Sequence, residues 1–349
     1  MRTTRILSRV VVLVGLAMSV AGGVLAASPP LLPFDVTRDL FVLDGGGQQI
    51  IRITPSRKIS VAVTRDEILA ATRQTEAHMT DNGLAVDGDG AVYFTEDVSN
   101  AILKWTPGTP VRVLTTARAI MAATDISGAD PIGFAFGSDG WLYVTEDVSG
   151  SVLRVNPHTG RVRVHASRRA LEAAEGITSV NLDQAIVGAE DGILYVISDG
   201  RPGALLRIDA DGDASVVAVD GVFDGASDDF MTRAADGALV VVDTETDGVI
   251  RVSGDGRQSL FLDPAEVVWL TAGNPKLDGT AFDGSGNFYM AESETDSILR
   301  FDRSREGAVW VSEADIAAAI GSDPNLLEVG IAFGPGLKLC LPMIGNGAP

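Results

Sequence analysis

The chain of 349 residues is poor in several residue types, and each shortage excludes a class of protein. It contains one cysteine, so neither a disulfide framework nor a metal site built from several thiolates can form within it. Only 27 lysine and arginine residues accompany 47 aspartate and glutamate residues, and the formal net charge is −20. This balance argues against a nucleic-acid-binding protein, because phosphate contacts need clustered basic side chains. Hydrophobic residues make up 46% of the chain, which is too many for a disordered polypeptide.

The N-terminal segment has the composition of an export signal. Three arginines among the first nine residues precede an apolar stretch over residues 10–26, which ends in small residues suited to a signal peptidase. An uncleaved membrane anchor is the alternative, since the stretch is nearly long enough to cross a bilayer. The glycines within the stretch favour cleavage. We therefore expect a signal peptide over residues 1–27 and one secreted or periplasmic domain over residues 28–349, with no membrane contact after cleavage.

A unit of roughly fifty residues recurs six times along the rest of the chain. Each copy has an apolar strand that ends in an acidic residue, a short polar turn, and a second apolar strand that carries one basic residue. The basic residues are Arg52, Lys104, Arg154, Arg207, Arg251 and Arg300. A glycine-flanked strand precedes most copies and a fourth strand follows, with Asp-Gly or Ser-Gly hairpin turns between apolar runs. The repeat predicts an all-β fold, a six-bladed β-propeller of four-stranded antiparallel blades.

Five of the six units carry a segment after the fourth strand that we expect to be a short helix. These segments cover residues 64–72, 116–124, 167–176, 263–273 and 312–321, and each begins with Ser, Thr or Asp as an N-cap. For closure of the ring, Gly330-Ile-Ala-Phe333 matches the innermost strand better than Leu31-Leu-Pro-Phe34 does. We expect the C-terminal strand to complete the first blade, with a seventh, truncated blade at residues 337–341 as the alternative.

Six residues immediately precede the innermost strands when the units are aligned on their strand-two acids. They are Asn82, Ile132, Gln184, Asp229, Asp278 and Val329. These positions should converge at one end of the central channel, which we call the mouth. Four of them, Asn82, Gln184, Asp229 and Asp278, carry side-chain oxygens that suit Ca²⁺ or Mg²⁺. They are therefore candidate metal ligands, with Ca²⁺ as the expected ion and Mg²⁺ or no metal as alternatives. The other interpretation is that they cap the strand entries and bind a channel water.

Further polar residues belong to the same end of the predicted channel. The strand-two acids recur from blade to blade, so we expect them to accept backbone N–H groups of the following turn: Asp44, Glu96, Glu146, Asp243 and Glu292. His78 lies just before the Asn82 strand and is a candidate acid or base, with a structural role as the alternative. The loops between second and third strands are rich in acids and contain Arg201 as their only basic residue. Such a mouth favours cations and disfavours anions.

The repeat resembles known propeller families. Gly83-Leu-Ala-Val-Asp87, Val92-Tyr-Phe-Thr-Glu96 and Asn100-Ala-Ile-Leu are similar to phrases of NHL-repeat propellers and of the related gluconolactonase (senescence-marker, regucalcin-like) propellers. The resemblance covers essentially the whole mature chain. It implies a divalent cation at the channel mouth, with Asn82-Gly83 and Asp278-Gly279 as two ligand-bearing phrases and Asp229 as a ligand or general base. The Glu-Gly-Pro phrase of that family has no counterpart near residues 28–45, so one expected ligand is missing.

Three functions follow from these observations. The first is a monomeric binding scaffold that holds a small molecule or a protein ligand at the acidic mouth, with or without a divalent cation. The second is a metal-dependent hydrolase of lactones or similar esters, in which Asn82, Asp229 and Asp278 hold Ca²⁺ and Asp229 and His78 act in catalysis. The third is a lyase, because Tyr93-Phe-Thr-Glu96 and Ile53-Thr-Pro55 resemble phrases of the streptogramin lyases. We prefer the scaffold, because this function does not need the metal ligand that the absent Glu-Gly-Pro phrase would supply.

Overall fold

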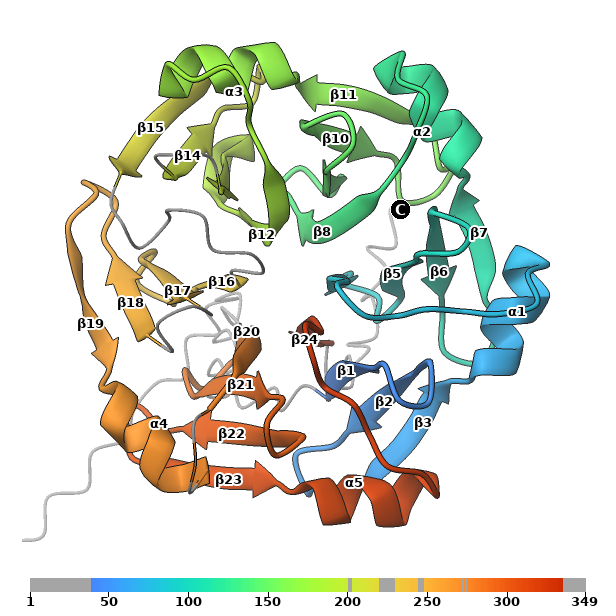
Figure 1. Ribbon diagram of the computed structural model, residues 1–349, viewed down its shortest axis with the longest axis vertical. Helices are drawn as coiled ribbons and strands as arrows, with labels where there is room; N and C mark the ends of the chain where they lie inside the picture. Colours follow the sequence, from blue (N-terminus) through green and yellow to red (C-terminus); the bar gives the residue numbers. More distant parts are fainter. Residues whose placement is uncertain are drawn as a thin grey trace, which may run out of the picture. The chain divides into compact units, whose positions relative to one another are not determined.

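The computed structural model describes residues 39–199, 203–219, 230–243, 248–271, 273 and 275–334, except for the side chains of Asp183 and Asp243. These residues form six four-stranded antiparallel sheets around a central axis (Figure 1). The predicted six-bladed β-propeller is confirmed. Residues 1–27 lie outside the described part, so the signal peptide stays a prediction. Within the described part, none of the helices has both the length and the apolar character needed to span a membrane.

The blades follow one another in chain order, and the four strands of a blade succeed one another from the central axis outward. Blade 1 contains β24 (Ile331–Phe333), β1 (Leu40–Asp44), β2 (Gln49–Ile53) and β3 (Ile59–Val63). Blade 2 contains β4 (Leu84–Val86), β5 (Val92–Glu96), β6 (Ala101–Trp105) and β7 (Arg112–Thr115). Blade 3 contains β8 (Pro131–Phe136), β9 (Leu142–Glu146), β10 (Ser151–Val155) and β11 (Val162–Ala166).

The second half of the ring repeats this arrangement. Blade 4 contains β12 (Leu182–Gly188), β13 (Leu194–Ser198), β14 (Ala204–Ile208) and β15 (Ala214–Val219). Blade 5 contains β16 (Phe230–Arg233), β17 (Leu239–Asp243), β18 (Gly248–Val252) and β19 (Gln258–Leu262). Blade 6 contains β20 (Leu277–Phe282), β21 (Phe288–Glu292), β22 (Ser297–Phe301) and β23 (Gly307–Val311).

The ring closes as expected from the inner-strand phrase. Strand β24 pairs antiparallel with β1, with Phe333 opposite Leu40, so the C-terminal strand completes the first blade. The N–H of Gly334 also donates to the carbonyl of Asp39 at 2.9 Å. The ring has six blades, and residues 337–341, the site of the alternative truncated blade, lie outside the described residues.

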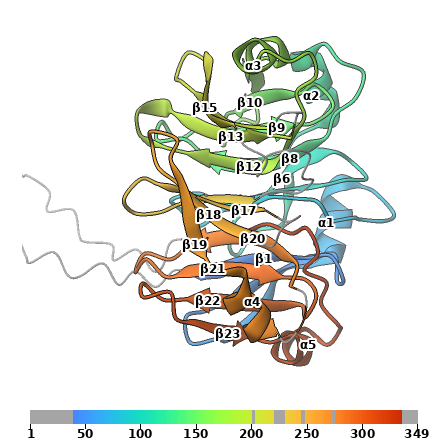
Figure 2. The same ribbon diagram turned by 60° about the vertical axis from the view of Figure 1, so that its left-hand side comes forward.

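The five helical inserts are confirmed at the expected places. They are α1 (Arg65–Thr72), α2 (Ala117–Thr124), α3 (Arg168–Glu175), α4 (Pro264–Thr271) and α5 (Glu313–Ile320). Four begin at a side-chain N-cap of the expected type: Thr64, Thr116, Ser167 and Ser312. Each helix packs on the outer strand of the next blade, at the circumference of the ring (Figures 1 and 2). The helices therefore join neighbouring blades. Residues 220–229, where the insert of blade 4 would stand, are outside the described part.

In four blades the recurring basic residue of the third strand forms an ion pair with an aspartate. Arg251 Nη2 lies 2.6 Å from Asp236 Oδ2, and Lys104 Nζ lies 3.6 Å from Asp87 Oδ2. Both aspartates belong to the segment that joins the first and second strands of the blade. That segment lies at the end of the inner strand opposite to the mouth, which we call the exit face. The basic repeat thus ties the third strand to the exit-face hairpin of its own blade.

Candidate functional site

The innermost strands contact one another just below the mouth. The N–H of Gly330 donates to the carbonyl of Asn82 at 2.8 Å, and the N–H of Gly279 donates to that of Val329 at 3.1 Å. A Cβ atom on Gly279 would lie 2.2 Å from the Val329 oxygen, so this approach requires glycine. The position is glycine in four of the six blades, and we call these residues the glycine collar: Gly83, Gly133, Gly279 and Gly330. The collar narrows the channel between the mouth and the exit face.

Two of the predicted metal ligands, Asn82 and Asp278, brace the backbone at the mouth. The amide Nδ2 of Asn82 donates to Asp97 Oδ1 at 2.6 Å and to the carbonyl of Thr80 at 2.6 Å. Oδ1 of Asp278 accepts the N–H of Glu328 at 2.9 Å, and the N–H of Asn82 donates to the Glu328 carbonyl at 3.3 Å. Asn82 and Asp278 therefore both bond the backbone of Glu328. This is the role expected of residues that cap the strand entries.

The remaining candidates are Gln184, His78 and Asp229. Gln184 is buried and lines a cavity on the exit side of the collar, whereas Asn82 and Asp278 do not line it. The side chain of His78 is exposed, and its backbone N–H donates to Glu96 Oε1 at 3.2 Å. Asp229 lies outside the described residues. In the described part of the chain, no three His, Cys, Asp or Glu side chains lie close enough to hold a metal ion. The metal and catalytic assignments stay predictions.

Four of the five strand-two acids act as predicted, and the side chain of the fifth, Asp243, lies outside the described part. The buried carboxylate of Glu292 accepts the N–H groups of Glu294 at 2.9 Å and Thr295 at 3.0 Å in the following turn. It also accepts the N–H of Lys276 at 3.0 Å, which precedes the innermost strand. Equivalent bonds are made by Asp44, Glu96 and Glu146. Each acid links two mouth segments of its own or the adjoining blade, and its charge is satisfied by backbone donors.

Other acids remain crowded above blades 2 and 3, and we call four of them the mouth acids: Asp81, Asp97, Asp130 and Asp147. Burial, reinforced by the charges of Asp130 and Asp81, raises the pKa of Asp97 to about 7, against the opposing hydrogen bond from Asn82. Burial and the carboxylate of Asp147 raise the pKa of Asp130 to about 6. Burial also raises the pKa of Asp147, opposed by a single cation, Arg168.

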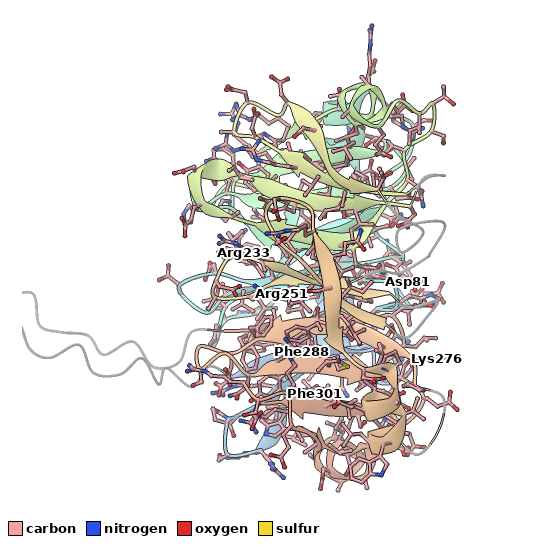
Figure 3. The ribbon with its side chains drawn as sticks, turned by 90° about the vertical axis from the view of Figure 1, so that its left-hand side faces the viewer. Asp81, Arg233, Arg251, Lys276, Phe288 and Phe301 are labelled. Carbon is pink, nitrogen blue, oxygen red and sulfur yellow. The ribbon has the colours of Figure 1, made fainter. Side chains whose placement is uncertain are left out.

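The sequence pointed to only part of this cluster. Asp97 and Asp147 belong to the acidic loops predicted to face the mouth. Asp81 and Asp130 were missed because they precede the aligned strand-entry position by one and two residues. Figure 3 shows Asp81 and Lys276 on one side of the molecule, with Arg233 and Arg251 toward the other. Asp81 and Lys276 thus lie toward the mouth, whereas Arg233 and Arg251 lie toward the exit face.

Comparison with known proteins establishes the fold and no closer relationship. No family model matches the sequence, and no curated protein is significantly similar to it. The nidogen structure from a nidogen/laminin complex aligns with a TM-score of 0.60 at 16% identity, over 86% of this chain and 99% of that chain. Virginiamycin B lyase from Staphylococcus aureus, as an inactive variant with quinupristin, aligns with a TM-score of 0.53 at 17% identity, over 80% and 86%.

A calcium-binding protein, regucalcin from Agrobacterium tumefaciens, is also similar. It aligns with a TM-score of 0.48 at 15% identity, over 67% of this chain and 74% of that chain. The protein is a six-bladed β-propeller that resembles nidogen and virginiamycin B lyase structures at low sequence identity. The resemblance drawn from the repeat is confirmed at the level of the fold.

Proposed function

We propose that this protein is an exported binding scaffold whose mouth acids capture a basic ligand, a cationic segment of a protein partner or a small cation. The observation that carries the proposal is the crowding of Asp81, Asp97, Asp130 and Asp147 with Arg168 as the cation that offsets Asp147. Export rests on the signal-like residues 1–27.

The physical argument is one of uncompensated charge. A carboxyl group whose pKa is raised is held in an environment where its ionised form is disfavoured. Asp97 and Asp130 are in that position, because burial and neighbouring carboxylates act on both. A bound cation supplies the missing countercharge and lowers both pKa values. Binding near neutral pH should therefore release protons.

The structurally similar proteins support the proposal of a binding scaffold, but they do not identify its ligand. The nidogen propeller was crystallised in a complex with laminin, which is an example of the fold holding a protein partner. The virginiamycin B lyase structure was determined with quinupristin, an example of the fold holding a small molecule. Since a fold does not determine function, the choice for this chain depends on its own mouth acids.

Isothermal titration calorimetry with a short alternating lysine–glycine peptide tests the proposal. The peptide should bind, a glutamate–glycine peptide should not, and the binding enthalpy should vary with the ionisation enthalpy of the buffer because protons are released. The triple variant Asp81→Asn, Asp130→Asn, Asp147→Asn should bind about tenfold more weakly, since each exposed or partly exposed ion pair contributes roughly half a kcal/mol.

A matched control keeps the net charge of that variant. Asp191→Asn, Asp211→Asn, Asp213→Asn removes three exposed acids of the exit face and should leave the affinity unchanged. Equal loss in both variants would indicate a bulk charge effect and would contradict the proposal.

The divalent-cation alternative has its own measurement. If Asn82 and Asp278 hold Ca²⁺, EDTA should lower the melting temperature, added Ca²⁺ should restore it, and Asp278→Ala should abolish the response. A Ca²⁺ response together with hydrolysis of a lactone would favour the hydrolase over the scaffold.

A further inference from the structure

The central channel holds a second feature, on the exit side of the glycine collar. A cavity of about 310 Å³ is lined by residues from all six innermost strands. Its volume lies at the lower end of the range for small-molecule sites, and it is equivalent to roughly ten water molecules of liquid. Polar atoms, many of them backbone, make up the larger part of its exposed surface, and five phenylalanines contribute apolar wall: Phe134, Phe136, Phe230, Phe282 and Phe333.

Of the described residues that line this cavity, one is charged, and it is an arginine. Arg233 ends strand β16 at the last position of the inner strand. At the same position the other blades have Val86, Phe136, Gly188, Phe282 and Phe333, all of which also line the cavity. No acidic residue belongs to the lining in the part of the chain that the structure describes. A protein with 47 acidic residues therefore has, among its described residues, a cationic cavity on its axis that is partly walled by phenylalanines.

Among the described residues, the guanidinium group of Arg233 has no countercharge. Nε of Arg233 is buried and has no hydrogen-bond partner in the described part of the chain, and none of the ion pairs found there includes this residue. Nη2 lies at the exit-face hairpin, where a Cβ on Gly237 would be 3.2 Å from it. The nearby acid of that hairpin, Asp236, is paired with Arg251. A second buried polar atom of the lining, Thr280 Oγ1, also lacks a partner among the described residues.

We propose that this cavity, entered from the exit face, binds a small monocarboxylate with an aromatic body, and that Arg233 holds the carboxylate. The guanidinium group presents its N–H donors in a planar fork that matches a carboxylate. The ring of the ligand would pack among the phenylalanines, where aromatic pairs prefer tilted or edge-to-face contacts. The site is independent of the mouth acids, which lie beyond the glycine collar.

Calorimetric titration of the full-length protein with three isosteric probes tests this inference. Phenylacetate should bind at least about tenfold more tightly than phenylacetamide, because a hydrogen bond to a charged group is worth more than a neutral one. The cation phenethylamine should not bind in the cavity. Equal affinities for phenylacetate and phenylacetamide would overturn the role of Arg233, and failure of all three to bind would overturn the site.

Two variants assign the effect to the residue. Arg233→Met keeps an unbranched side chain and should reduce phenylacetate affinity to the level of phenylacetamide. Arg303→Met removes an exposed positive charge from the same face, outside the cavity lining and bonded to a backbone carbonyl, and should leave the affinity unchanged. Equal losses in the two variants would show a general effect of charge and would contradict the inference.

A spectroscopic measurement locates the ligand even if a variant is poorly folded. In wild-type protein labelled with methyl-¹³C methionine, phenylacetate should shift the resonance of Met231, which lines the cavity. The resonance of Met290, buried in blade 6 and outside the cavity lining, should not move. A shift of Met290 without Met231 would place the ligand elsewhere and overturn the proposal.

Discussion

The side-chain amide of Asn82 donates a hydrogen bond to Oδ1 of Asp97 at 2.6 Å and so connects the entry of strand β4 to the loop after β5. The same bond opposes the rise of the Asp97 pKa that burial produces. A residue predicted as a metal ligand thus also braces the mouth and stabilises one of its acids. A substitution of Asn82 would change both the backbone brace and the charge of Asp97. The roles of the mouth residues are therefore better tested by substitutions at the other acids.

The strand-two acids should be important for stability. Glu292→Ala leaves three backbone N–H groups without their acceptor, and we expect a loss of about 2–4 kcal/mol in the free energy of unfolding. Urea denaturation measures the change. Glu294→Ala removes an exposed acid two residues away and should stay within about 0.5 kcal/mol of wild type. Similar losses for the two variants would contradict the capping role.

The glycine collar should not tolerate a methyl group. In Gly279→Ala the new Cβ would lie 2.2 Å from the carbonyl oxygen of Val329, so the inner strands of blades 6 and 1 must separate. We expect a loss of about 1–3 kcal/mol or more, measured by chemical denaturation, because overpacking of a closely packed region has that cost. At Gly88 a Cβ would meet no atom within 4 Å, so Gly88→Ala is the control and should be nearly neutral.

The mouth acids should make stability depend on pH. The pKa of Asp130 is raised to about 6 in the folded protein, so the folded state binds more protons than the unfolded state between about pH 4 and 6. This group therefore stabilises the fold less as pH rises through that window. Asp130→Asn should match wild type near pH 4 and be more stable at pH 7, by thermal melts across the range.

The control for this pH effect is Asp211→Asn, which removes an exposed acid of the exit face. Its stability relative to wild type should change little between pH 4 and 7. If Asp130→Asn also shows no gain at pH 7, the crowding of the mouth acids that supports the scaffold proposal is contradicted.

The features of the fold that could be predicted from the sequence depend on short local sequence patterns. The strand-two acids, the N-caps such as Thr64 and the match of Gly330-Ile-Ala-Phe333 to an inner strand are short phrases whose roles depend on nearby backbone. The structure confirms each of them. The site could not be predicted as well, because the use of an oxygen such as Asp278 Oδ1 depends on which backbone N–H stands beside it in another blade.

The sequence by itself determined the six-bladed ring, its closure, its helices and the acidity of its mouth, because a repeated period and charge are properties of the chain. The tertiary structure decided which side chains of different blades lie close together. It brought Asp81 and Asp130 to Asp97, and it placed Arg233 in a cavity lined by phenylalanines on the axis. These relationships depend on how closely neighbouring backbones approach, which no single repeat encodes.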